Sequence, residues 1–277
     1  MKRLARRASL SFEYRTRLVR SRLACEYREL ALSRADREHE QEANFARLGL
    51  SRSHGKSAIA TALAASRLGA FSEDDNMFSE HLLVFGALSK ALPDAREILE
   101  VGTYDGRAAL LLANLFPQAR VTTIDLAAND PIYAQSYQSA RTAEFVRRRD
   151  ETLSRSNRVQ FLETNSLSLV TDLGSGRFDL VWVDGDHDFP VVAVDLANAV
   201  RLAKPGGFVM CDDVVTEKCR RSTTYLSDAA HRTLTAMRGA GLIDEPVYVY
   251  KRLGKRHQYP RKFVAIAAAT RAVSRAS

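Results

Sequence analysis

The chain has 277 residues, of which 45% are hydrophobic and 27% charged, as is ordinary for a globular protein. No apolar run approaches the roughly 20 residues that a transmembrane helix needs, and no apolar stretch follows the basic N-terminus as a secretory signal requires. The three cysteines form no CxxC pair, so neither a zinc site nor a disulfide framework is indicated. We therefore expect a protein of the reducing cytoplasm.

The net charge of +8 is concentrated at the N-terminus. Residues 1–37 hold eleven Lys and Arg against four Asp and Glu, a net charge of +7, so the rest of the chain is close to neutral. Such a basic arm indicates an acidic partner such as nucleic acid. Apolar residues recur in the arm at helical spacing, which indicates instead a helix that packs on the body or forms a homo-oligomer. Both interpretations stay open, and residues 1–94 are predicted to be a basic helical extension or cap.

Two helices are expected to complete this extension. The triplet Gly55-Lys56-Ser57 lacks the spacing and the preceding strand of a phosphate-binding loop, so we interpret it as a turn before an Ala-rich helix. Ser79 is a candidate N-cap for a second helix, which must end before Pro93.

From residue 95 the pattern changes to apolar strands that alternate with helices. Strands are expected at 97–102, 120–126, 158–164, 178–184, 208–213, 247–253 and 262–269, and helices at 107–116, 191–203 and about 222–239. This alternation predicts a mostly parallel sheet with helices on both faces. Because the last two strands have no helix between them, one of them is expected to be antiparallel. Residues 95–277 therefore form the predicted α/β domain.

The turn after the first strand has features of a ligand-binding loop. Gly102 and Gly106 bracket it, and such a turn lets backbone N–H groups and a helix N-terminus face a polar ligand. Asp125 ends the second strand, where an acidic side chain commonly binds a ribose diol. Together they indicate a nucleoside-bearing cofactor, although a structural turn and a capping acid explain the same residues.

Acidic residues gather after the next two strands of the predicted sheet. Asp184, Asp186 and His187 follow the fourth strand, and Asp212 and Asp213 end the fifth. Neighbouring strands lie about 4.8 Å apart, so three carboxylates can converge at one edge, where a divalent cation would relieve their repulsion. Oxygen ligands favour Mg²⁺, Mn²⁺ or Ca²⁺ over zinc. The alternative is that Asp213 caps the following segment and Asp184 orders the loop.

Two stretches carry a family resemblance. The segments "EILEVGTYDGRAALLLANLFPQARVTTIDL" and "RFDLVWVDGDH…LAKPGGFVMCDDV" resemble the motifs of class I S-adenosylmethionine-dependent methyltransferases. Tyr104 replaces the usual middle glycine, which is similar to the catechol O-methyltransferase-like branch. The resemblance implies a Rossmann-like, seven-stranded sheet and S-adenosylmethionine as cofactor. It implies cofactor contacts at Glu100, Gly102, Thr103, Tyr104, Gly106, Asp125, Asn165, Ser166 and Asp184.

The same resemblance assigns roles to the acidic residues. Metal-dependent O-methyltransferases, including the antibiotic sugar methyltransferases, carry an acid at one position and an acid–Asn or acid–acid pair at a second, a pattern that Asp184, Asp212 and Asp213 match. The metal implied is Mg²⁺. The resemblance also implies a general base: related enzymes often place it three positions after the first metal acid, here His187, and some sugar methyltransferases use the acid two positions after it, here Asp186. Asp188 is expected to cap the following helix.

The acceptor is defined only in outline. The long segment 127–157 is expected to cover the site. Its run Arg147 to Arg149, together with Arg220 and Arg221, favours an anionic acceptor. Solvated helix charges explain the triple run equally well. We expect methyl transfer to a hydroxyl of a small molecule or of a sugar or glycan precursor. The alternatives are an RNA methyltransferase that uses the basic arm, or a non-catalytic, nucleoside-binding member of the fold.

Overall fold

The computed structural model describes residues 34–70, 79–131, 142–169, 173–217, 226–253 and 261–270. The strands are β1 (Glu97–Val101), β2 (Arg120–Asp125), β3 (Val159–Glu163), β4 (Phe178–Val183), β5 (Ala203–Val214), β6 (Val247–Tyr250) and β7 (Phe263–Ala268). The helices are α2 (Arg34–Arg47), α3 (Arg52–Ser66), α4 (His81–Ala91), α5 (Arg107–Leu115), α7 (Thr142–Leu153), α9 (Val191–Leu202) and α10 (Ala229–Gly239), with a 3-10 turn η2 (Ser166–Ser168).

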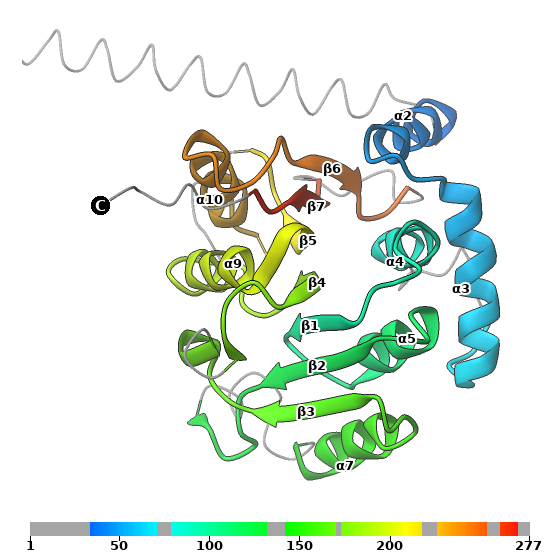
Figure 1. Cartoon of the computed structure of the whole chain (residues 1–277), viewed down its shortest axis with the longest axis vertical. Helices are drawn as coiled ribbons and strands as arrows, with labels where there is room; N and C mark the ends of the chain where they lie inside the picture. Colours follow the sequence, from blue (N-terminus) through cyan, green and yellow to red (C-terminus); the bar gives the residue numbers. More distant parts are fainter. Residues whose placement is uncertain are drawn as a thin grey trace, which may run out of the picture.

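The seven strands form one sheet in the order β3-β2-β1-β4-β5-β7-β6. Its pairs are parallel from β3 to β5, whereas β7 runs antiparallel to both of its neighbours, β5 and β6. Helices α4, α5 and α7 lie on one side of the sheet and α9 and α10 on the other, as Figure 1 shows. The predicted fold class, with helices on both faces and one antiparallel strand, is therefore confirmed.

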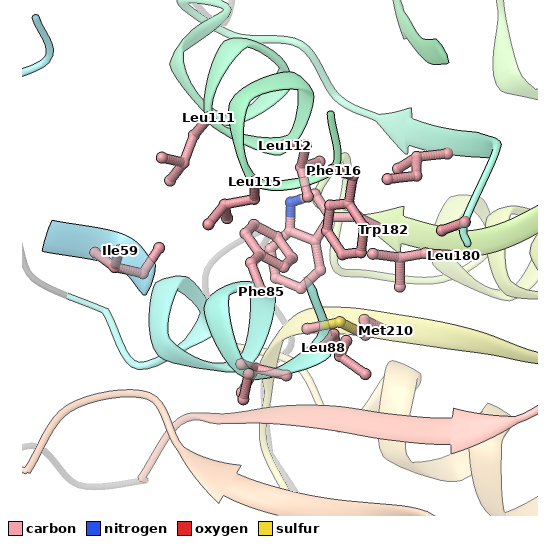
Figure 2. Close-up of a cluster of buried hydrophobic side chains, with 14 of the residues drawn as sticks. Ile59, Phe85, Leu88, Leu111, Leu112, Leu115, Phe116, Leu180, Trp182 and Met210 are labelled. Carbon is pink, nitrogen blue, oxygen red and sulfur yellow. The ribbon is translucent and has the colours of Figure 1, made fainter. Parts of the chain in front are cut away.

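Two hydrophobic clusters form the core, one where the central strands meet α9 and α10 and the other where they meet α4 and α5. Leu180, Trp182 and Met210 point from β4 and β5 into this layer and are fully buried. The ring of Trp182 meets that of Phe85 edge to face at 5.2 Å, a favoured aromatic geometry. Figure 2 shows these side chains packed together with Ile59, which reaches the cluster from α3. The run of apolar residues in β4 is thus explained by burial on both faces of the sheet.

Helix α2 covers one outer edge of the sheet. β6 is the edge strand at this end of the sheet. Gln41 of α2 accepts a hydrogen bond from the backbone N–H of Tyr250 at 2.9 Å and donates one to its carbonyl at 3.1 Å. Arg52 of α3 pairs with the buried Glu80 at 2.7 Å. Contrary to expectation, Ser79 is not the N-cap of α4: Glu80 holds that position, and the Ser79 hydroxyl contacts the His81 ring.

The predicted basic arm falls mostly outside the described residues, which begin at Arg34. Arg220 and Arg221 lie outside them as well. None of the helices in the described segments has the length and apolarity that a membrane crossing requires.

Two glycines let α3 and α4 approach closely. A methyl group added at Gly86 would lie 2.5 Å from the carbonyl oxygen of Gly55, and one added at Gly55 would lie 2.3 Å from the carbonyl oxygen of Leu83. Backbone atoms cannot yield as a flexible side chain can. The triplet Gly55-Lys56-Ser57 lies within helix α3, so it is not a phosphate-binding loop, but the expected turn before the helix was wrong as well.

We predict that Gly86→Ala destabilises the protein by about 1–3 kcal/mol, because overpacking forces the two helices apart. Equilibrium unfolding in urea measures the change. The matched control is Gly239→Ala, where an added methyl group meets no atom within 4 Å, so stability should stay the same or rise by up to about 1 kcal/mol. Equal effects of the two substitutions would contradict this packing.

Candidate active site

The loop between β1 and α5 is held tightly against its neighbours. Gly102 has a φ of 99°, and its N–H donates to the carbonyl of Ile124 at 2.9 Å. A Cβ at this position would lie 2.3 Å from the carbonyl oxygen of Asp184, so only glycine fits. The predicted cofactor loop and the loop that carries the acidic residues are therefore in direct backbone contact.

Tyr104 and Asp125 close the outer side of this loop. Tyr104 has a φ of 48°, the left-handed conformation that glycine adopts at least cost. Its N–H donates to Asp125 Oδ2 at 3.1 Å, and Asp125 Oδ1 accepts from Leu126 N–H at 2.9 Å. Burial raises the pKa of Asp125 above its ordinary value. The predicted ribose-binding carboxylate is thus fixed by backbone donors.

Glu100 and Thr103 lie beneath the loop. Thr123 donates to Glu100 Oε2 at 2.5 Å, and the hydroxyls of Thr103 and Thr123 are 2.7 Å apart. Burial raises the pKa of Glu100 to about 8, so this carboxyl is mostly neutral at pH 7. Glu100 is therefore linked to the loop through Thr123 and Thr103. Gly106, with a φ of 76°, is the N-cap of α5.

The predicted adenine-side residues follow β3. The side chain of Asn165 accepts from Leu167 N–H at 3.0 Å and so caps the turn η2. The carbonyl of Ser166 accepts from Asn198 of α9 at 2.7 Å. Ser166 also bonds to the carboxyl of Asp195, whose pKa burial raises to about 6. Helix α9 thus fixes the position of this turn.

A bulge in β5 aims the acidic pair at the edge of the sheet. The pairing of β5 with β7 shifts register between Cys211 and Val214, so Asp212 and Asp213 together oppose a single residue of β7. Asp213 has a φ of 52°, which L-residues other than Asn and Asp rarely adopt. In a regular strand the two side chains would point to opposite faces. The bulge lets both carboxylates face the same partner.

That partner is a pair of lysines. Lys251 follows β6 and Lys262 precedes β7, and the N–H of Lys251 donates to the carbonyl of Lys262 at 3.0 Å. The ammonium of Lys251 lies 2.5 Å from Asp212 Oδ2 and also bonds to Asp213 Oδ1. The ammonium of Lys262 lies 2.6 Å from Asp213 Oδ2. Three of the four carboxylate oxygens of the pair therefore accept from an ammonium group.

Burial and the neighbouring charges of this cluster shift the pKa values of Asp184, Asp212 and Lys251. Burial and then the charge of Asp212 raise the pKa of Asp184 well above its ordinary value, which favours a protonated carboxyl. Although burial acts in the opposite direction, the ammonium of Lys251 holds the pKa of Asp212 well below its ordinary range. Burial likewise opposes the charge on Lys251, but Asp212 and Asp213 raise its pKa overall.

These contacts bear on the Mg²⁺ site expected from the resemblance. Asp184, Asp212 and Asp213 do converge: His187 Nε2 lies 3.7 Å from Asp184 Oδ1 and 3.9 Å from Asp213 Oδ2, and Lys251 joins Asp213 to Asp212. A divalent cation needs several oxygen ligands at about 2.0–2.6 Å, whereas most oxygens of the Asp212–Asp213 pair already bind ammonium groups. In the described segments, no group of three or more His, Cys, Asp or Glu side chains is arranged to hold a metal ion. The donor set does not fit the expected metal.

His187 stands beside the acidic cluster. Its Nε2 lies 3.7 Å from Asp184 Oδ1 and 3.9 Å from Asp213 Oδ2. Burial lowers the pKa of this imidazole, and the charges of Asp212 and Asp213 oppose that change only in part. A neutral imidazole at pH 7 is able to accept a proton.

The other residues of this loop have structural contacts. Asp186 Oδ1 accepts from the N–H of Asp188 at 2.9 Å and so orders the turn. Asp188 is not the N-cap of α9, as the sequence had predicted; Pro190 holds that position. The side chain of Asp188 accepts instead from Phe189 N–H and from the Ser227 hydroxyl, both at 2.8 Å.

Four residues near the site were not predicted from the sequence, and the arginine run 147–149 had been left with two interpretations. Lys251 and Lys262 could not be found because they lie far along the chain from their partners. Asp195 could have been found, because an acidic residue among the apolar residues of a helix is visible in the sequence. His81 was missed too: burial lowers its pKa to about 4, and its ring lies 5.1 Å from that of Trp182. In the arginine run, Arg147 and Arg148 pair with glutamates of their own helix, and Arg149 is buried over Phe161.

Comparison with known proteins agrees with this geometry. A family model described as a methyltransferase domain matches residues 99–214. The catechol O-methyltransferase of Mycobacterium tuberculosis is 31% identical over 188 residues, which are 65% of this chain and 76% of that protein. An O-methyltransferase from Streptomyces achromogenes, solved in complex with S-adenosylmethionine, has a TM-score of 0.52 and 20% identity; the match covers 85% of this chain and 99% of that one and shows a shared fold.

The fold and the relative together place this protein in a family. The chain belongs to the class I S-adenosylmethionine-dependent methyltransferases. Within that class it belongs to the O-methyltransferase branch, as the resemblance of its motifs had indicated.

We predict that Asp125→Asn raises the dissociation constant for S-adenosylmethionine about 10-fold or more, because a hydrogen bond to a charged acceptor contributes about 1.5–3 kcal/mol. Isothermal titration calorimetry measures the constant. Asp94→Asn, an exposed acid in the turn before β1, is the matched control and should leave it unchanged. Unaltered binding by a folded Asp125→Asn variant would remove this residue from the cofactor site.

Proposed function

We propose that this protein transfers the methyl group of S-adenosylmethionine to a hydroxyl of a small molecule or of a sugar or glycan precursor, with His187 as the general base. The observation that carries the proposal is the position of His187. Its Nε2 is within 4 Å of the acidic cluster, in the loop whose Asp184 carbonyl contacts Gly102. A base and a cofactor loop therefore meet at the carboxyl ends of β1 and β4, where α/β sheets bind their ligands.

The cofactor supplies a methyl group bound to a positively charged sulfur, which makes its carbon open to attack. In the proposed step, His187 Nε2 accepts the proton of the acceptor hydroxyl, and the hydroxyl oxygen forms a bond to the methyl carbon. The carbon–sulfur bond breaks, and its electron pair remains on sulfur. The products are a methyl ether and S-adenosylhomocysteine, and the proton on His187 is then released to water.

The chain contributes mainly alignment to this displacement. Gly102 and Asp184 fix the distance between the cofactor loop and the base loop, since their backbones are in contact. Asp125, fixed by the N–H groups of Tyr104 and Leu126, is proposed to hold the ribose. Positioning of this kind removes much of the entropic barrier of a bimolecular reaction. Glu100 is proposed to act from beneath, through Thr123 and Thr103.

Asp186 is a weaker candidate for the base. One of its oxygens accepts the N–H of Asp188 in the turn, and the side chain shows no pairing with the acidic cluster among the described contacts. The expected Mg²⁺ has no step in the proposed reaction, because Lys251 and Lys262 already occupy most oxygens of its proposed ligands Asp212 and Asp213.

The acceptor is the open part of the proposal. Radiolabelled S-adenosylmethionine should be offered with phenols, sugar nucleotides, glycans and RNA, each with and without EDTA. Label on a phenol or sugar hydroxyl supports the proposal. Label on RNA would replace it with the alternative in which the basic arm of residues 1–37 binds nucleic acid. No binding of S-adenosylmethionine at all would indicate a non-catalytic member of the fold.

We predict that His187→Gln lowers kcat by about 100-fold to 10,000-fold, the usual contribution of a general base. The dissociation constant for S-adenosylmethionine should change little, because the substituted side chain serves the acceptor and not the cofactor. Asp186→Asn, tested in parallel, should retain more activity than His187→Gln. If the order of the two variants is reversed, Asp186 is the base.

A further inference from the structure

The two lysines at the acidic cluster have a position that the fold itself determines. Lys251 and Lys262 are opposed residues of an antiparallel pair, joined by a backbone hydrogen bond of 3.0 Å. Side chains of directly opposed residues lie on the same face of a sheet. Both ammonium groups therefore project together toward the bulge of β5, where Asp212 and Asp213 accept them.

The lysines contact both the acidic pair and the surroundings of the base. Asp213 Oδ2 accepts from Lys262 at 2.6 Å and is also 3.9 Å from His187 Nε2. Lys251 bridges the two carboxylates of the pair. Each lysine side chain is 14% exposed, so the pair lies at the wall of the site and is not sealed in the core.

A divalent cation and these ammonium groups compete for the same oxygens. Both need the lone pairs of Asp212 and Asp213, and a dication placed there would repel two positive charges a few ångströms away. The lysines have the advantage that strand pairing holds them in place, whereas a metal ion must be taken from solution. The cluster is thus supplied with positive charge by the chain itself.

We propose that Lys251 and Lys262 replace the divalent cation in this enzyme, so that its methyl transfer is independent of metal. The paired ammonium groups stabilise the negative charge that develops on the acceptor oxygen as His187 takes its proton, and both lysines keep their own protons throughout. This inference rests on the proposed function, because it concerns the acceptor oxygen of that reaction.

The first test uses the wild-type protein and Mn²⁺ as the probe. We expect that titration followed by electron paramagnetic resonance shows no stoichiometric binding of Mn²⁺, and that activity in EDTA equals activity in Mg²⁺. One tightly bound Mn²⁺ per chain, or activity that EDTA abolishes and Mg²⁺ restores, would overturn the proposal. The Mn²⁺ titration needs no acceptor, so it separates this proposal from a failure to find one.

The second test removes the lysines. The double variant Lys251→Met with Lys262→Met should bind one Mn²⁺ per chain, because its carboxylates have lost their counter-charges, and a further Asp213→Asn substitution should abolish that binding. The single variant Lys251→Met should lower kcat about 100-fold, as loss of a group that stabilises an oxyanion does, with S-adenosylmethionine binding retained. An unchanged kcat in this variant would contradict the role of the lysine.

The matched control is Lys204→Met. Lys204 also pairs with an aspartate, Asp179 at 2.6 Å, but Asp179 lies near the opposite end of β4 from the site. This variant should neither bind Mn²⁺ nor lose activity. Loss of S-adenosylmethionine binding in calorimetry would show that the double variant fails to fold. The wild-type titration would then still decide between the lysines and a metal.

Discussion

Three acidic side chains gather at one end of the sheet, and the position of their counter-charges governs the rest of the site. Parallel strands end together, so Asp184 after β4 and Asp212 in β5 are brought together by topology and would repel one another if all were ionised. The hairpin of β6 and β7 resolves this conflict with Lys251 and Lys262. The antiparallel end of the sheet thereby becomes part of the chemistry that the parallel strands assemble.

Small departures from regular structure carry this arrangement. The bulge in β5 and the left-handed Asp213 turn two adjacent carboxylates to one side, and the left-handed Tyr104 lets its N–H reach Asp125. Gly102 then joins the two halves, because its missing side chain leaves room for the carbonyl of Asp184. Each departure costs some backbone stability and places a polar group where the proposed reaction needs it.

Local patterns were enough to predict the strands, the sheet architecture and the ends of the strands where acids stand. Asp125 and Asp184 were found in this way because each directly follows an apolar run, whereas His187 was proposed from the resemblance to known methyltransferases. The lysines could not be found so, since Lys251 is 39 positions from Asp212 and meets it only through the order β5-β7-β6. The expectation of a metal has the same origin. The sequence shows the carboxylates at neighbouring strand ends, whereas the lysines that pair with them are brought there only by long-range strand pairing.

The hydrogen bonds of Gln41 have a consequence for how the protein can be divided. An exposed edge strand is a template on which other chains can pair, and the amide of Gln41 occupies the N–H and the carbonyl of Tyr250 as a neighbouring strand would. Arg37 adds a bond to the carbonyl of Leu253. A shortened protein that starts at β1 would lack α2. It would leave β6 uncovered, directly before Lys251 of the site. Its solubility, and not only its activity, therefore depends on the helices that precede the sheet.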